Sequence, residues 1–346
     1  MQRILVITNC LTGGGAERSM NLLVNELHSR GIVVALMPIN KGDQDLVKPD
    51  CPVFPLNRTW NGNLLDFSRA YLRFLTILKS WKPTVVILNC DLPELFGALS
   101  LKLIPRIIVV EHTNHPFASR ILLGKMIRKI LRRMKAEFVA VSPHLDIWQV
   151  STKPQRILLN AIMMEPKQVS ISNQSQHLRL RNVVYVGRLA TIQKRPQIML
   201  EIAKKIQNKV IIIGAGEAKE DIEQRVRSES LDVEMLGYMN NPWEHLEQND
   251  LFIVPSLFEG DGMVVIEALE RDLPVLLSDI PDFRRFNLPS SNYCVDAAEF
   301  VKRIKEYEYR INELKVPLSI RGKILSSRNP KAVGDSWVSY LDQQGS

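Results

Sequence analysis

Short runs of apolar, β-branched residues alternate with longer amphipathic stretches along most of the chain. In the first half, five such runs are predicted to be strands, separated by stretches with apolar residues at helical spacing. The expected strands are Arg3–Thr8, Val33–Ile39, Val85–Asn89, Arg106–His112 and Glu137–Ser142. The expected helices lie near Glu17–Arg30, Leu64–Trp81, Pro93–Leu103 and Arg120–Lys135. This alternation predicts a parallel sheet covered by helices on both faces.

A polar stretch that is poor in helix signals, Lys167–Arg181, is predicted to link two domains. Beyond it the alternation restarts, so the chain is expected to contain two Rossmann-like α/β halves. The second set of strands is Asn182–Gly187, Lys209–Gly214, Val233–Gly237, Leu251–Ser256 and Pro274–Asp279. Its helices are expected around Pro196–Gln207, Lys219–Glu229 and Met263–Leu269, and a last helix over Pro330–Leu341.

The composition indicates how many domains the chain can form and in which compartment the protein is expected. With 346 residues, 45% of them hydrophobic, the chain can bury large cores in about two domains. It contains no run of about 18 uncharged apolar residues, and its first residues lack a signal-peptide layout. Its four cysteines are scattered, as in reduced cytoplasmic proteins. We therefore expect a cytoplasmic protein.

The net charge of +8 is concentrated in the first half, which has 21 Lys and Arg against 11 Asp and Glu through Asn160. Much of the excess lies in Ala118–Glu137, where basic residues surround an apolar set at helical spacing. Such a helix can lie on an anionic membrane surface, or it can pack as an ordinary helix with a solvated basic face. The sequence leaves both open. Nucleic acid is not expected as a partner, because no aromatic residues interleave the basic ones.

The segment Pro255–Leu269, PSLFEGDGMVVIEAL, carries the most chemical information. It predicts a buried strand, a glycine turn and the start of a helix, where unpaired N–H groups bind anions such as a diphosphate. Glu259 and Glu267 lie eight positions apart on either side of this turn and can accept hydrogen bonds from hydroxyls. A diphosphate beside hydroxyl groups is the chemistry of a nucleotide sugar.

This segment resembles the E-x7-E signature of the retaining glycosyltransferases of GT-B fold, family 4, with flanking residues that also agree. The resemblance implies an α/β fold of GT-B type, with two Rossmann-like domains facing across a cleft. Residues 1–165 would form the acceptor-binding domain and 166–329 the nucleotide-sugar-binding domain, while 330–346 would cross back to the first. Asp261 departs from the pattern, because the family usually has a bulky apolar or aromatic residue there.

Further segments support the resemblance. Leu11–Gly31 is similar to the family's G-G-A-E-R loop, in which Gly14 and Gly15 would approach the ligand closely. Val186–Ala203 is similar to V-G-R-L followed by a lysine, which implies that Arg188 and Lys194 hold the donor diphosphate. His112 follows a strand, as does the family's histidine beside the donor sugar, whereas His115 fits less well. Gly214 and Gly216 match a G-x-G near the donor base and phosphate.

The resemblance also implies roles within the central segment. Glu267 would bind the ribose hydroxyls and Glu259 the sugar hydroxyls, while backbone N–H groups near the turn would contact the diphosphate. The turn residues concerned are Gly260, Gly262, Met263 and Val264. The donor would be a nucleoside-diphosphate sugar, UDP-linked, used without a cofactor or metal. Asp43 and Asp45 imitate a metal-binding D-x-D motif but lie in a polar loop of the other half.

The expected activity is therefore transfer of a hexosyl or N-acetylhexosaminyl group, with retention, to a hydroxyl of a lipid-linked glycan in bacterial surface polysaccharide assembly. This enzyme would act in the cytoplasm, or at the inner face of the cytoplasmic membrane. Other possibilities within the fold are a phosphorylase, a nucleotide-sugar epimerase and a non-catalytic partner subunit. An NAD-dependent oxidoreductase is a different class, but the G-x-G at Gly214 lacks the third glycine of that fingerprint.

Overall fold

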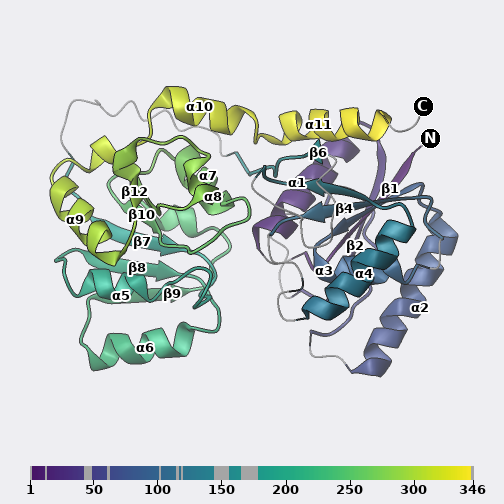
Figure 1. Cartoon of the computed structure of the whole chain (residues 1–346), viewed down its shortest axis with the longest axis horizontal. Helices are drawn as coiled ribbons and strands as arrows, with labels where there is room; N and C mark the ends of the chain where they lie inside the picture. The colour runs from purple at the N-terminus through teal and green to yellow at the C-terminus, as the bar shows by residue number, and fades with distance from the viewer. Residues whose placement is uncertain are drawn as a thin grey trace. The chain divides into compact units, whose positions relative to one another are not determined.

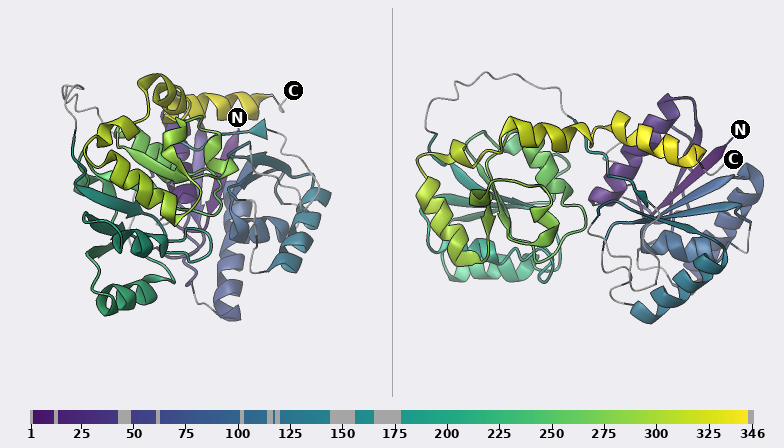
Figure 2. Two further views of the ribbon diagram at one scale, coloured as in Figure 1. Left: turned by 60° about the vertical axis from the view of Figure 1, so that its left-hand side comes forward. Right: turned by 45° about the horizontal axis from the view of Figure 1, so that its top comes forward.

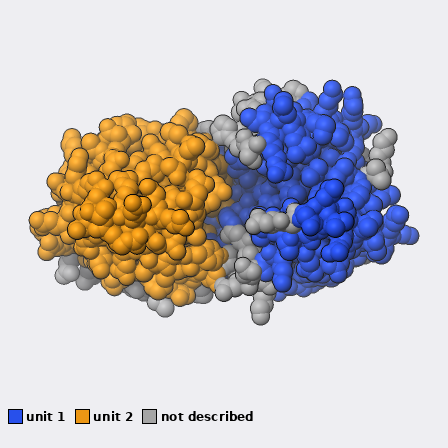
Figure 3. Space-filling view, turned by 90° about the horizontal axis from the view of Figure 1, so that it is seen from below, with its two compact units in different colours: residues 1–163, 327–346 blue, residues 164–326 orange. Residues whose placement is uncertain are grey.

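The computed structural model describes residues 2–11, 14–42, 49–60, 63–100, 103–113, 117, 120–143, 156–164 and 178–343. The chain divides into two compact units, coloured separately in Figure 3. Unit 1 comprises Met1–Met163 and Ser327–Ser346, and unit 2 comprises Met164–Ser326. The sequence placed these boundaries after residues 165 and 329. Most of the expected linker lies outside the described residues.

Within its described residues, unit 1 contains a six-stranded parallel sheet in the order β2-β1-β3-β4-β5-β6 (Figure 1). Its strands are β1 (Arg3–Thr8), β2 (Val33–Pro38), β3 (Val85–Asn89), β4 (Arg106–Glu111), β5 (Glu137–Ala140) and β6 (Arg156–Ile157). Its helices are α1 (Gly15–Ser29), α2 (Leu64–Trp81), α3 (Asp91–Ala98), α4 (Ile121–Arg133) and α11 (Pro330–Asp342). Helices cover both faces of the sheet (Figures 1 and 2), which explains why the strands are continuously apolar.

The last helix, α11, belongs to unit 1 and packs along α1. Trp337 and Tyr340 are buried in the same core as the β1 residues. A Cβ at Gly334 would lie 2.6 Å from the Glu26 side chain, so the small residue allows the two helices to approach closely. Chain residues far apart in sequence therefore build one core.

Unit 2 contains, in its described part, a second six-stranded parallel sheet in the order β12-β11-β10-β7-β8-β9. Its strands are β7 (Asn182–Val186), β8 (Lys209–Ile213), β9 (Val233–Gly237), β10 (Leu251–Val254), β11 (Val275–Ser278) and β12 (Tyr293–Cys294). Its helices are α5 (Ile198–Ala203), α6 (Lys219–Ser228), α7 (Met263–Glu270), α8 (Pro281–Arg284), α9 (Ala297–Tyr307) and α10 (Leu318–Ser326), with short 3-10 turns including η2 (Pro242–His245).

Sequence patterns located most of these elements but missed the two-residue strands β6 and β12 and the helices α8, α9 and α10. Helix α9 had a usable signal, because Asp296 caps it by accepting a hydrogen bond from the Glu299 N–H at 2.8 Å. Helix α5 is shorter than predicted at both ends, since turns occupy the two residues before Ile198 and the two residues after Ala203. Within the described residues no helix is long and apolar enough to span a bilayer.

Candidate functional site

The turn between β10 and α7 has the geometry expected of an anion-binding helix start. Gly262 is the N-cap of α7 and adopts the left-handed conformation, with φ +58°, which favours glycine. The first bond of the helix runs from the Val265 N–H to the Gly262 carbonyl at 2.9 Å. The N–H groups of Met263 and Val264 precede that bond, at the positive end of the helix dipole.

Two predicted site residues, Lys194 and Glu259, form a partly buried ion pair. The Lys194 Nζ donates to both carboxylate oxygens of Glu259, at 2.6 and 2.8 Å. The Ser256 hydroxyl donates to the same carboxylate at 2.7 Å, and Glu259 is only 5% exposed. The carboxylate therefore holds the ammonium in place through two of its three N–H donors. The family resemblance implies separate roles for the two residues, with the diphosphate bound by Lys194 and the sugar by Glu259.

Arg188 reaches the same turn through Gln193. Arg188 is exposed, and its guanidinium donates to the Gln193 side-chain oxygen at 2.9 Å. The Gln193 carbonyl in turn accepts from the Leu257 N–H at 2.8 Å. The loop after β7, which carries Arg188 and Lys194, is thus fastened to the loop after β10, which carries Glu259. Gln193 was not predicted.

Gly214 and Gly216 have a packing role that sequence alone did not reveal. Both have positive φ, +148° and +155°. A Cβ at Gly214 would lie 1.8 Å from the Gly187 carbonyl oxygen, and one at Gly216 would lie 2.6 Å from the Leu189 carbonyl oxygen. The two glycines therefore allow the backbone on either side of Arg188 to approach the loop after β8, and so position that arginine.

The opposite side of the turn is held by residues of the α8 segment, which no sequence motif indicated. The Glu259 N–H donates to Asp282 at 3.0 Å. Arg285 donates to the Asp261 carboxylate at 2.7 Å and also to the Asp261 carbonyl oxygen. Asp261 is 6% exposed, so the charge that replaces the family's apolar residue is neutralised within the fold. Glu259 and Asp261 are both anchored from α8.

Glu267 lies on α7, about one and a half turns from Gly262, and is 6% exposed. The indole N–H of Trp243, in η2, donates to its carboxylate at 3.2 Å. Trp243 follows β9 and was not predicted as a site residue, since a single tryptophan in a loop carries no spacing signal.

In unit 1, His112 and the glycine loop are connected by Asn89. His112 follows β4, and its Nε2 lies 2.6 Å from the Asn89 Oδ1. The Asn89 amide donates to Thr8 at 3.2 Å and to the Ala16 carbonyl at 3.5 Å, in the first turn of α1. Gly14 is the N-cap of that helix. Asn89, a polar residue at the end of a buried strand, therefore joins the carboxyl ends of β1, β3 and β4.

Beside this edge, unit 1 buries a charged group that corrects an expectation about α4. Arg128 was expected on the basic face, but it is 1% exposed. Its guanidinium donates to Glu94 at 2.7 and 3.0 Å and also to Glu111. Burial raises the pKa of both carboxyls, and repulsion from Glu111 adds to the rise for Glu94. One arginine therefore donates hydrogen bonds to two buried carboxyl groups.

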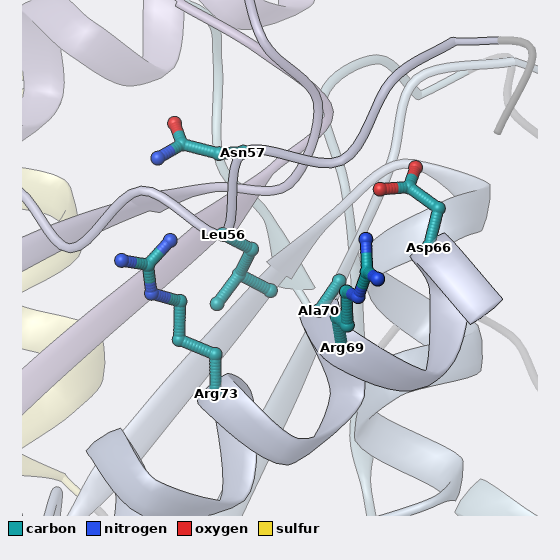
Figure 4. Close-up of a pocket in the computed structure, with 6 residues that line it drawn as sticks. All are labelled: Leu56, Asn57, Asp66, Arg69, Ala70 and Arg73. Carbon is teal, nitrogen blue, oxygen red and sulfur yellow. The ribbon is translucent and has the colours of Figure 1, made fainter.

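Unit 1 also contains a pocket of about 380 Å³ (Figure 4). It lies beside α2 and is lined by Leu56, Asn57, Asp66, Arg69, Ala70 and Arg73. None of the predicted site residues lines it, so it does not mark the predicted donor site. Asp43, Asp45 and His115, also considered from the sequence, lie outside the described residues.

Comparison with known proteins gives two family matches. Residues 181–307 match the family described as glycosyl transferases group 1, and residues 13–146 match glycosyltransferase family 4. The fold is similar to that of HepE from Anabaena, solved with UDP and glucose, with a TM-score of 0.77 and 14% identity over 99% of this chain and 100% of that one.

Two sequence relatives come from bacterial glycan synthesis. The O-antigen biosynthesis glycosyltransferase WbnH of Escherichia coli is 35% identical over 43% of this chain, which spans about half (47%) of that relative. A Campylobacter jejuni protein is 29% identical over 81% of each chain. Its name is N-acetylgalactosamine-N,N'-diacetylbacillosaminyl-diphospho-undecaprenol 4-alpha-N-acetylgalactosaminyltransferase.

Proposed function

Because the chain belongs to the group 1 glycosyltransferases of GT-B fold, we propose that it builds a bacterial surface polysaccharide. It transfers a hexosyl or N-acetylhexosaminyl group from a UDP-linked sugar to a hydroxyl of a lipid-linked glycan, with retention and without a metal ion. The observation that carries the proposal is the Lys194–Glu259 ion pair before the start of α7, with Arg188 held through Gln193 on the same loop as Lys194. Relatives in O-antigen and diphospho-undecaprenol chemistry support the acceptor class.

In the proposed reaction, unit 2 binds the donor. The third N–H of Lys194, the Arg188 guanidinium and the N–H groups of Met263 and Val264 bind the diphosphate, which gains negative charge as it leaves. The bond between the anomeric carbon and the phosphate oxygen breaks, the acceptor oxygen bonds to that carbon from the same face, and the departing phosphate oxygen takes the acceptor proton. Glu259 binds sugar hydroxyls and Glu267 the ribose, and we assign His112 of unit 1 to the transferred sugar.

The function is tested by incubating the protein with UDP-sugars and a short diphospho-polyprenyl glycan. The linkage of the product is then determined by NMR. Activity that persists in EDTA and gives an α-linked product from an α-linked donor supports the proposal. Activity that requires a divalent cation, or an inverted product, contradicts it. Phosphate-dependent release of a sugar phosphate would indicate a phosphorylase, while tight binding of NAD alone would indicate an oxidoreductase.

We also propose that α4 attaches unit 1 to the inner face of the membrane. Its outward side combines exposed apolar residues with cations: Ile121, Leu122 and Met126 are 51%, 84% and 55% exposed, and Lys125 and Lys129 are exposed beside them. Each basic residue near anionic headgroups contributes roughly 1 kcal/mol at low salt. This face is therefore suited to an anionic bilayer.

Vesicle sedimentation tests the attachment. The protein should pellet with phosphatidylglycerol vesicles at low salt and be released by high salt. Lys125→Glu with Lys129→Glu should remain in the supernatant, while the matched pair Lys302→Glu with Lys305→Glu, on α9 of unit 2, should still pellet. Equal behaviour of the two double variants would rule out attachment through α4.

A further inference from the structure

Trp243 is held rigidly beside the carboxylate of Glu267. The indole is 5% exposed and packs edge-on against Phe252 of β10, with ring centroids 5.5 Å apart. The Arg271 guanidinium lies over the indole at 5.0 Å and also donates to the Glu267 carbonyl at 3.1 Å. The ring is thus fixed by a strand and by the end of α7.

The hydrogen bond between Trp243 and Glu267 sets the rotation of the carboxylate. An indole N–H can only donate, and here it donates to Oε2 of Glu267 at 3.2 Å, in a buried position. Because Trp243 cannot turn, the carboxylate plane is fixed as well. A carboxylate can accept hydrogen bonds from two neighbouring hydroxyls of one ribose only if its plane is correctly oriented. Hydrogen bonds weaken steeply when they are misaligned.

We propose that Trp243 is a positioning residue for the nucleotide ribose: its indole N–H orients the Glu267 carboxylate toward the two ribose hydroxyls. This inference rests on the proposed role of Glu267 in ribose binding. Trp243 acts through Glu267 and does not itself take part in group transfer. If the ring served only to fill the core, its N–H would not affect how the protein distinguishes one ribose from another.

Trp243→Phe removes the N–H and keeps an aromatic ring in the same space. The measurement is calorimetric affinity for UDP and for 2′,3′-dideoxy-UDP, whose ratio reports the hydroxyl contacts. The wild type should prefer UDP by about tenfold or more, which corresponds to one or two well-aligned hydrogen bonds. In Trp243→Phe most of this preference should disappear, while the affinity for dideoxy-UDP stays within about twofold of the wild-type value. With the UDP-sugar, KM should rise and kcat should change little.

Two further variants separate this inference from the function on which it rests. Glu267→Gln should also lose the preference for UDP, and Trp337→Phe, a buried tryptophan in the core of unit 1, should retain it. If Glu267→Gln loses the preference and Trp243→Phe keeps it, the role of Trp243 is wrong and the role of Glu267 stands. A wild type that fails to bind UDP, or that binds both nucleotides equally, overturns the donor assignment and this inference together.

Discussion

The ammonium of Lys194 lies within hydrogen-bonding distance of both carboxylate oxygens of Glu259, although 65 residues separate the two in sequence. The pair joins the loop after β7 to the loop after β10, at the carboxyl ends of neighbouring strands. Such edges are where ligands bind in open parallel sheets. The cation that we propose binds the diphosphate is therefore positioned by the carboxylate that we propose binds the sugar hydroxyls.

Removal of one member of this pair should cost both stability and activity. Lys194→Met leaves a carboxylate that is 5% exposed without its cation, so unit 2 should lose about 3–5 kcal/mol of unfolding free energy. Glu259→Gln in the same chain removes the buried charge and should restore most of that stability, but not sugar transfer. Denaturant unfolding and turnover are measured on the same samples. A single Lys194→Met variant as stable as the wild type would contradict this account of the pair.

Gly214→Ala should displace the backbone around Arg188. Its Cβ would lie 1.8 Å from the Gly187 carbonyl oxygen, and the expected cost is about 3 kcal/mol or more, with weaker UDP binding. Gly237→Ala is the matched control, because its φ is also positive, at +71°, but nothing lies within 4 Å of the added Cβ. That control should cost about 1 kcal/mol and leave UDP affinity unchanged. Similar losses in the two variants would show that backbone conformation, not the contact with Gly187, is decisive.

Asp261→Leu should alter the choice of donor sugar more than the binding of UDP. Asp261 lies two residues from Glu259, and the family usually has an apolar residue there. In this variant Arg285 keeps its bonds to the carbonyl oxygens of Asp282 and of residue 261, so the expected cost is only about 1–3 kcal/mol. The ratio of kcat/KM between UDP-glucose and UDP-N-acetylglucosamine should change by about tenfold, a difference of about 1.4 kcal/mol. An unchanged ratio would exclude Asp261 from sugar recognition.

The buried Glu94, Glu111 and Arg128 should make unit 1 less stable as pH rises. Burial and, to a smaller extent, repulsion from the nearby Glu111 raise the pKa of Glu94 from 4.5 to about 8 in the folded protein. The folded state then binds a proton that the unfolded state has released, so stability decreases between about pH 4.5 and pH 8. Glu94→Gln removes this dependence and should be more stable than the wild type at pH 9, by about 1–3 kcal/mol.

The comparison with Glu94→Gln is made by thermal unfolding at pH 6 and pH 9. Glu223→Gln, a surface substitution on α6, is the control. It measures how the loss of one negative charge by itself changes the dependence of stability on pH. If Glu94→Gln and the wild type respond equally to pH, the Glu94 carboxyl is not protonated in the folded protein as this arrangement requires.

Several features of the protein follow from sequence because they depend on neighbours along the chain. Runs such as VVILN at Val85–Asn89 predict buried strands, since both faces of a covered parallel sheet need apolar residues. The glycine turn before Met263 is also local, because only a residue that tolerates positive φ can begin α7 as Gly262 does. The identity and spacing of Glu259 and Glu267 are likewise properties of the sequence alone.

Other features were decided only by tertiary packing. Arg128 belongs to a basic run, yet α3 and β4 bring two carboxyls against it and bury it. Trp243 and Glu267 are 24 residues apart, and Asp282 lies 23 residues from Glu259. Which distant side chains meet is set by strand order and by the loops at the sheet edge, and neither leaves a periodic trace in sequence. The sequence thus determined which groups we propose for the chemistry, while the fold determined which residues hold them in position.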